Sequence, residues 1–323
     1  MDKIFHGLNE KQIEAVKAID GPVLVISGPG SGKTRCLTHR VAYLISQGIR
    51  PGSILAITFT NKAANEMRER IDKLLEIKST QPTIGTFHSI CLRILRKEIS
   101  LLGYKSNFSI FDTNDQVSLI KKVMANLEID PKKYNPNSIL NKISKLKTDL
   151  IFSEDYNPTD FFAKIVSRIY NNYQAELKRM NGLDFDDLIV LTVKIFKQHP
   201  DILEKYQNYW KYILVDEYQD TSHDQYTLIK LLSAKNKNIF ALFFFLLGSW
   251  LFFKAINGQP WLLLLSGLSF GIDLIIYHSV KVVLPIMLGF LVIAYLPKIK
   301  LIRGYGLAAA VILSLFILLI AFN

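Results

Sequence analysis

The sequence predicts two different parts: an α/β domain over residues 1–240 and an apolar, all-helical segment over residues 241–323. Three observations lead to this prediction. An apolar run at residues 23–27 is followed at once by a glycine-rich loop and a helical pattern, and a second apolar run ends in two adjacent acids. From position 238 onward only six charged residues occur. The two parts therefore belong in different surroundings, one in water and one in an apolar medium.

The first part is mildly basic. Residues 1–237 contain 34 Lys and Arg against 27 Asp and Glu, which leaves room for a polyanionic partner without requiring one. This length suffices for one or two packed cores. The two cysteines, Cys36 and Cys91, suggest neither a disulfide framework nor a metal site, which favours a reducing compartment. The N-terminal stretch "MDKIFHGLNEKQ" is too polar for a secretory signal, so we expect this part in the cytoplasm.

The first strand leads into a phosphate-binding loop. Counted from Ser27, the segment "SGPGSGKT" fits the spacing G-x-x-x-x-G-K-[ST], with serine in place of the first glycine. Backbone amides at a helix N-terminus can surround phosphate oxygens, Lys33 can reach the β- and γ-phosphates, and Thr34 can bind Mg²⁺. A chance glycine turn is the alternative. The loop residues predicted to contact a nucleotide are Gly28, Pro29, Gly30, Ser31, Gly32, Lys33 and Thr34.

The second strand, residues 212–215, ends in Asp216 and Glu217 within "VDEYQDTS". A carboxylate at a strand end beside a phosphate loop can hold Mg²⁺, and its neighbour can orient or deprotonate the attacking water. We therefore predict Asp216 as a metal ligand, and Glu217 and Lys33 as catalytic residues. Taken alone, an acidic pair is more often a solvated loop.

Six segments together resemble the N-terminal portion of a superfamily 1 DNA helicase of the UvrD/Rep/PcrA type, over about residues 5–240. In order, they are "LNEKQIEAV", "GPGSGKTR", "AITFTNKAANEMRERI", "TIGTFHSICLRIL", "LDFDDLI" and "VDEYQDTS". The resemblance implies part of a 3′–5′ DNA helicase that uses ATP and Mg²⁺. It places Gln12 in the adenine-reading position and Arg35 directly after the phosphate loop, as a further nucleotide-site residue.

The same resemblance implies a RecA-like P-loop NTPase fold interrupted by a helical insertion. The first part of the ATP-binding domain would be 1–105, the insertion 106–184 and the second part 185–240, with the membrane segment following at 241–323.

Two further segments predict contacts to single-stranded DNA. Phe59 offers a stacking face with Thr60 and Asn61 as hydrogen-bonding neighbours, and Phe87 and His88 follow another strand. Stacking, polar contact and positive charge are the means by which single strands are held. The alternative is that both phenylalanines are core aromatics and that His88 is a structural histidine. The resemblance favours DNA contact.

Other charged residues favour structural interpretations. Asp184, Asp186 and Asp187 could suggest a metal cluster, but we predict an exposed acidic helix start, where carboxylates complement the helix dipole. The lysines of "KKVMANLEIDPKKYN" and "ILNKISKLKTDL" are expected on solvated helix faces, with some following a phosphate backbone.

The family pattern ends abruptly. The segment "KNKNIF" fits the start of the buried strand that follows "VDEYQDTS" in the family, and that strand would end in a segment similar to "GDDDQSIY". Instead, "ALFFFLLGSW" stands there. The later helicase motifs, with their charge-stabilising arginines and the second RecA-like domain, are not found in the sequence that follows. Because an arginine finger alone contributes about 10³–10⁵ in rate, we expect nucleotide binding without motor activity.

The last part predicts a multi-pass membrane protein with the lipid bilayer as partner. Four apolar segments, near 239–256, 260–277, 281–297 and 305–322, are each close to the lower length limit for a span, and buried soluble helices are the alternative. With a cytoplasmic front, four spans would put the basic cluster of residues 298–303 outside, against the positive-inside rule. The alternative is that one segment does not span, and the segment with Asp273 is the first candidate. The basic cluster would then lie on the cytoplasmic side.

Two interpretations compete with a helicase portion joined to membrane spans. One is a membrane protein with an inert or regulatory nucleotide-binding front. The other is an accidental join near Phe240, arising by gene fusion, rearrangement or sequence assembly, with "ALFFFLLGSW" foreign to the helicase part.

Overall fold

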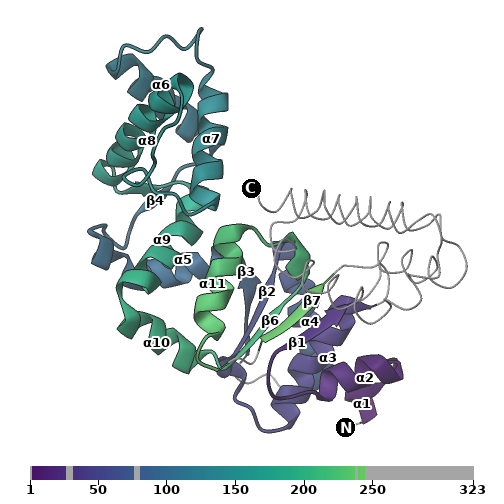
Figure 1. Cartoon of the computed structure of the whole chain (residues 1–323). Helices are drawn as coiled ribbons and strands as arrows, with labels where there is room; N and C mark the ends of the chain where they lie inside the picture. Colours follow the sequence, from purple (N-terminus) through teal and green to yellow (C-terminus); the bar gives the residue numbers. More distant parts are fainter. Residues whose placement is uncertain (1, 27–31, 76–80, 237–238, 244–323) are drawn as a thin grey trace, which may run out of the picture.

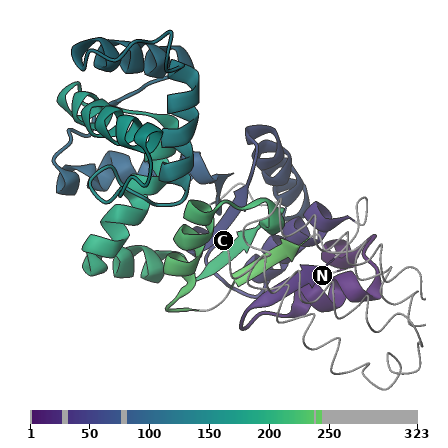
Figure 2. The same ribbon diagram turned by 45° about the horizontal axis from the view of Figure 1, so that its top comes forward.

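The computed structural model describes residues 2–26, 32–75, 81–236 and 239–243. These residues form a parallel sheet covered by helices on both faces, with a separate helical lobe that projects from it (Figures 1 and 2). The arrangement confirms the predicted α/β class.

The sheet has five strands in the order β1-β7-β6-β2-β3, and every neighbouring pair is parallel. All five carboxyl ends therefore lie along one edge. β2 is buried along its whole length, as expected for a parallel strand covered on both faces. The strands are β1 (Val23–Ile26), β7 (Ile239–Phe243), β6 (Tyr212–Val215), β2 (Ile54–Thr58) and β3 (Thr83–Thr86).

β7 corrects one expectation. The first predicted membrane span was residues 239–256, and its first five residues are β7. Its backbone pairs with β1 on one side and with β6 on the other, with Ala241 opposite Leu24 and Val215. The sheet therefore continues three residues past Phe240, and its edges are β1 and β3.

Each face of the sheet has its own apolar core because side chains alternate along a strand. Ile54 and Ala56 of β2 pack among the helices of one face, and Leu55 and Ile57 pack among those of the other. The first face carries α1 (Asp2–Phe5), α2 (Glu10–Lys17), α3 (Lys33–Ser46) and α4 (Asn61–Leu75). The second carries α5 (Phe87–Glu98), α9 (Phe185–Gln198), α10 (Pro200–Tyr209) and α11 (His223–Ser233). Short 3₁₀ turns are η1 (Pro51–Ser53), η2 (Ile99–Leu102) and η3 (Tyr218–Asp220).

The lobe consists of three helices with a third apolar core, which includes Ile120, Ile143, Ile169 and Tyr173. It is the segment for which the sequence predicts a helical insertion. Two short parallel strands close its base (Figure 1). The elements are β4 (Ser109–Ile110), α6 (Thr113–Asn126), α7 (Pro136–Thr148), α8 (Phe161–Arg179) and β5 (Gly182–Leu183).

Among the helices that the structure describes, none combines the length and the apolar character needed to cross a bilayer. Apart from β7, the four predicted spans lie outside the described residues. The segment that contains Asp273 and the basic cluster between the last two spans lie outside them too.

Candidate functional site

Apart from Gln12 on α2, the predicted site residues follow four strands that end at one edge of the sheet. β1 leads toward the phosphate loop and α3, and β6 leads into the acidic pair. β2 and β3 lead into the two segments predicted to contact DNA. In open α/β sheets this carboxyl edge is where ligands bind.

The first contact at this edge joins residues 182 positions apart. The Thr34 hydroxyl donates a hydrogen bond to Asp216 Oδ2 over 3.2 Å. The Asp216 amide donates to the Ile57 carbonyl over 2.9 Å, which ties the acid to β2. Asp216 is only 5% exposed, and burial together with the charge of Glu217 raises its pKa. A hydroxyl and a buried carboxylate that favours a nearby cation form a donor set that suits Mg²⁺.

The second contact pairs the phosphate-loop lysine with the neighbouring acid. Lys33 Nζ lies 3.6 Å from Glu217 Oε2, and the lysine side chain is 9% exposed. Glu217 has φ 49° and ψ 47°, a left-handed conformation that is uncommon outside glycine and concentrates at functional sites. The Gln219 amide donates to Glu217 Oε2 over 2.6 Å. The sequence analysis missed Gln219, whose signal is its place two residues after the acid within "DEYQD".

Gly32 and Gln12 meet at the end of the phosphate loop. Gly32 caps α3 with φ 79°, and a Cβ there would lie 3.2 Å from Gln12 Nε2, so glycine suits the position on both counts. Gln12 Oε1 accepts from the Asn9 amide, and Asn9 Oδ1 accepts from the Gln12 amide, both over 2.9 Å. This capping box fixes Gln12 beside the loop. The predicted contacts Gly28, Pro29, Gly30 and Ser31 lie outside the described residues.

The Arg35 side chain contacts the segment that precedes Gln12. Its exposed guanidinium donates to the Gly7 carbonyl over 3.2 Å and thereby ties α3 to the turn between α1 and α2. The structure therefore shows a bracing contact for the Arg35 side chain.

Of the two predicted DNA-stacking phenylalanines, one is buried. Phe87 is 2% exposed and packs edge-on against Phe59 at 5.7 Å between ring centroids, so the core alternative is correct for Phe87. Phe59 itself is half-buried. Thr60 and Asn61 are exposed at the start of α4, and Thr60 Oγ1 accepts from the Ala63 amide.

His88 forms a second aromatic surface with a residue that the sequence analysis missed. Its ring stacks on Phe185 at 4.0 Å between centroids, and Phe185 is 53% exposed. Burial lowers the pKa of His88 to about 4, so the ring is neutral at pH 7. The sequence does contain a sign of this role. Phe185 is an aromatic residue among the acids of "LDFDDL", whereas a solvated helix start would favour polar residues.

The acids around Phe185 correct another expectation. They do begin a helix, but Asp184 and Asp187 are each 1% exposed and both contact Lys147, which is equally buried. The predictions of an exposed acidic start and of a solvated lysine at this position are therefore wrong. Among the residues that the structure describes, no three His, Cys, Asp or Glu side chains gather as metal ligands.

Comparisons with known proteins identify the family of this chain. The UvrD/REP helicase N-terminal domain matches residues 8–248, past the predicted junction near Phe240. The ATP-dependent DNA helicase PcrA of Staphylococcus aureus (strain Mu50) is 48% identical over 242 residues, and that of Bacillus subtilis (strain 168) is 48% identical over 241. Each match covers 74% of this chain and 33% of the relative, so the chain spans about a third of the length of these curated relatives. The chain belongs to the UvrD/REP helicase N-terminal domain family.

Proposed function

We propose that the sheet domain binds ATP with Mg²⁺ at its carboxyl edge and single-stranded DNA beside it, as the corresponding portion of a UvrD-like 3′–5′ DNA helicase would. The observation that carries this proposal is the double contact between α3 and the end of β6, Thr34 with Asp216 and Lys33 with Glu217. The relatives' description as ATP-dependent DNA helicases supports both ligands.

Each residue of the nucleotide site has a role that follows from its surroundings. Lys33 compensates phosphate charge, and Thr34 and Asp216 would hold Mg²⁺, which neutralises charge on the β- and γ-phosphates when bound. Glu217, held between Lys33 and Gln219, orients the attacking water and accepts its proton. Gln12 lies beside the end of the phosphate loop, where its amide can recognise adenine.

The DNA site uses two aromatic surfaces on neighbouring strand ends. Phe59 provides one, and the His88–Phe185 stack provides the other. Base stacking on such side chains contributes roughly 1–3 kcal/mol per base. Thr60 and Asn61 add exposed polar groups beside Phe59. We do not assign duplex unwinding to this chain, because the sequence after β7 shows none of the later helicase motifs.

Nucleotide binding is tested most simply by removing the phosphate-loop lysine. We expect Lys33→Ala to weaken ATP binding in Mg²⁺ at least tenfold in calorimetry, because it removes the positive charge that the phosphate loop offers to the β- and γ-phosphates. Lys73→Ala removes an exposed lysine at the end of α4 and should bind ATP like the wild type. Equal binding by the Lys33→Ala and wild-type proteins would contradict the assignment.

On sequence alone, we further propose that residues 244–323 anchor the chain in a lipid bilayer with the ATP-binding domain on the cytoplasmic side. The support is the long apolar composition of this stretch, with only six charged residues.

A further inference from the structure

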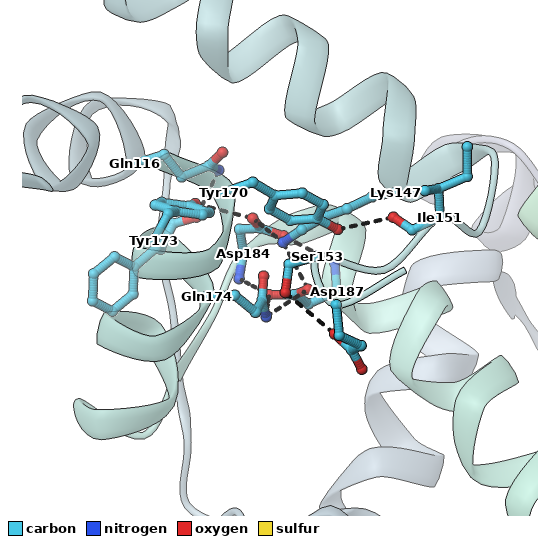
Figure 3. A network of polar contacts seen from close by, with 11 residues as sticks. Gln116, Lys147, Ile151, Ser153, Tyr170, Tyr173, Gln174, Asp184 and Asp187 are labelled. Carbon is cyan, nitrogen blue, oxygen red and sulfur yellow. Dashed lines mark hydrogen bonds and ion pairs between the residues drawn. The ribbon is translucent and has the colours of Figure 1, made fainter. Parts of the chain in front are cut away.

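A buried ion triad joins the helical lobe to the sheet domain. Lys147 on α7 places its Nζ 2.6 Å from Asp184 Oδ2 and 2.7 Å from Asp187 Oδ1 (Figure 3). Burial disfavours the charged lysine, but the two carboxylates outweigh this effect and raise its pKa. The Lys147 ammonium therefore donates to one oxygen of each carboxylate.

Lobe helix α8 holds the same two carboxylates. The Tyr173 hydroxyl donates to Asp184 Oδ2 over 3.0 Å, and the Gln174 amide donates to both oxygens of Asp187 over 3.3 Å (Figure 3). The start of α9 is thus held by two lobe helices at once.

These carboxylates also build the first turn of α9. The Asp187 amide donates to Asp184 Oδ1 over 2.9 Å, and the Asp184 amide donates to Asp187 Oδ2 over 3.1 Å. Phe185 lies within this capping box, exposed, with its ring on His88. The lysine therefore fixes the very turn that presents an aromatic ring to solvent.

A stabilising role alone explains the triad poorly. Buried ion pairs are often no more stabilising than apolar residues of similar volume, whereas they specify one geometry. Here the geometry specified is the direction in which the first turn of α9 leaves the lobe.

We propose that Lys147 is a positioning residue that couples the lobe to the DNA-binding face. By holding Asp184 and Asp187, it keeps Phe185 stacked on His88 and ready to receive a base of single-stranded DNA. This role rests on the proposed DNA site and assigns the lobe a part in forming it.

The test is a double-mutant cycle on the full chain, with fluorescein-labelled oligo(dT) and anisotropy as the readout. Lys147→Met and Phe185→Ala should each weaken binding about tenfold, and the double variant should be no weaker than either one. Lys145→Met is the matched control, because it removes an exposed lysine from the same helix. Any loss of DNA affinity that it causes should simply add to the loss caused by Phe185→Ala. ATP affinity should stay within twofold in every variant.

Additive losses in the cycle would overturn the proposal, as would a parallel loss of ATP affinity. If Lys147→Met fails to fold, Asp187→Asn decides the question: it keeps the Lys147–Asp184 pair and should weaken DNA binding about threefold through Phe185 alone.

A second readout separates this proposal from the DNA site itself. In Phe185→Trp protein labelled with 5-fluorotryptophan, Lys147→Met should shift or broaden the fluorine resonance of position 185. The shift supports positioning even if the wild type binds no DNA, a result that would refute the proposed DNA site alone. An unchanged resonance would overturn the positioning role.

Discussion

At the residue scale, the nucleotide site is defined by how its two acids are held. Asp216 is buried against Thr34, and its raised pKa reflects burial and the neighbouring Glu217. Glu217 adopts a left-handed backbone conformation between Lys33 and Gln219. Two adjacent carboxylates favour an additional cation, which ATP·Mg²⁺ brings.

His88 should make stability depend on pH. Its folded pKa of about 4 lies below the unfolded value of about 6.5, so the unfolded chain binds more protons between these values. Stability should therefore fall as pH drops from about 6.5 to 4. Because the ring is only partly buried, we expect a loss of about 1 kcal/mol between pH 7 and 5. Urea unfolding at both values measures it.

His88→Gln should remove this part of the pH dependence. His6→Gln, which removes an exposed histidine, should leave it in place. An identical acid-induced loss in His88→Gln and wild-type protein would show that His88 is not the cause.

At the element scale, β7 is the decisive strand because it pairs on both sides. Its place between β1 and β6 joins the strand before the phosphate loop to the strand before Asp216. Without β7, the two halves of the nucleotide site would have no shared hydrogen-bond ladder.

A proline in β7 should therefore unfold the sheet domain. Ala241 pairs with β1 and β6, and proline would remove its amide and clash with the ladder, at a cost of about 3 kcal/mol or more. Ala241→Gly keeps the amide and should cost about 1 kcal/mol at most. Thermal unfolding of residues 1–243, followed by circular dichroism, distinguishes the two. Equal melting temperatures would contradict a central β7.

The sequence predicted β1, β2 and β6 because each is an apolar run that ends in a polar motif. The start of β7 was predicted from "KNKNIF", but its continuation over residues 241–243 was assigned to a membrane span. An apolar run with no polar residue to mark its end fits a buried strand and a span equally well. The buried triad was missed for another reason: Lys147 lies 37 residues before Asp184 in a lysine-rich helix, and only the tertiary fold brings them together.

At the scale of the whole molecule, β7 also changes the expected membrane topology. With residues 239–243 in the sheet, the first apolar segment keeps only 244–256, too short to span a bilayer. Three spans would then return the basic cluster 298–303 to the cytoplasmic side, as the positive-inside rule requires. If the proposed anchoring holds, we therefore expect the first segment, rather than that of Asp273, not to span.

Cysteine labelling in intact cells tests this topology. We expect a cysteine at Ser279 to react with an impermeant reagent from outside and one at Gly304 to be protected until the membrane is opened. The reverse pattern would indicate four spans, and recovery of the protein in the soluble fraction would exclude membrane anchoring.

We infer that two segments 182 residues apart form one site for ATP and Mg²⁺, and the variant Asp216→Asn tests this inference. Asparagine keeps the shape and can still accept the Thr34 hydrogen bond, but it lacks the charge that holds a divalent cation. The decisive measurement is calorimetric ATP affinity with Mg²⁺ and with EDTA. We predict that Mg²⁺ strengthens wild-type binding at least tenfold, and that Asp216→Asn loses most of this gain while its affinity in EDTA is unchanged. A variant that retains the full Mg²⁺-dependent gain would show that Asp216 does not hold the cation.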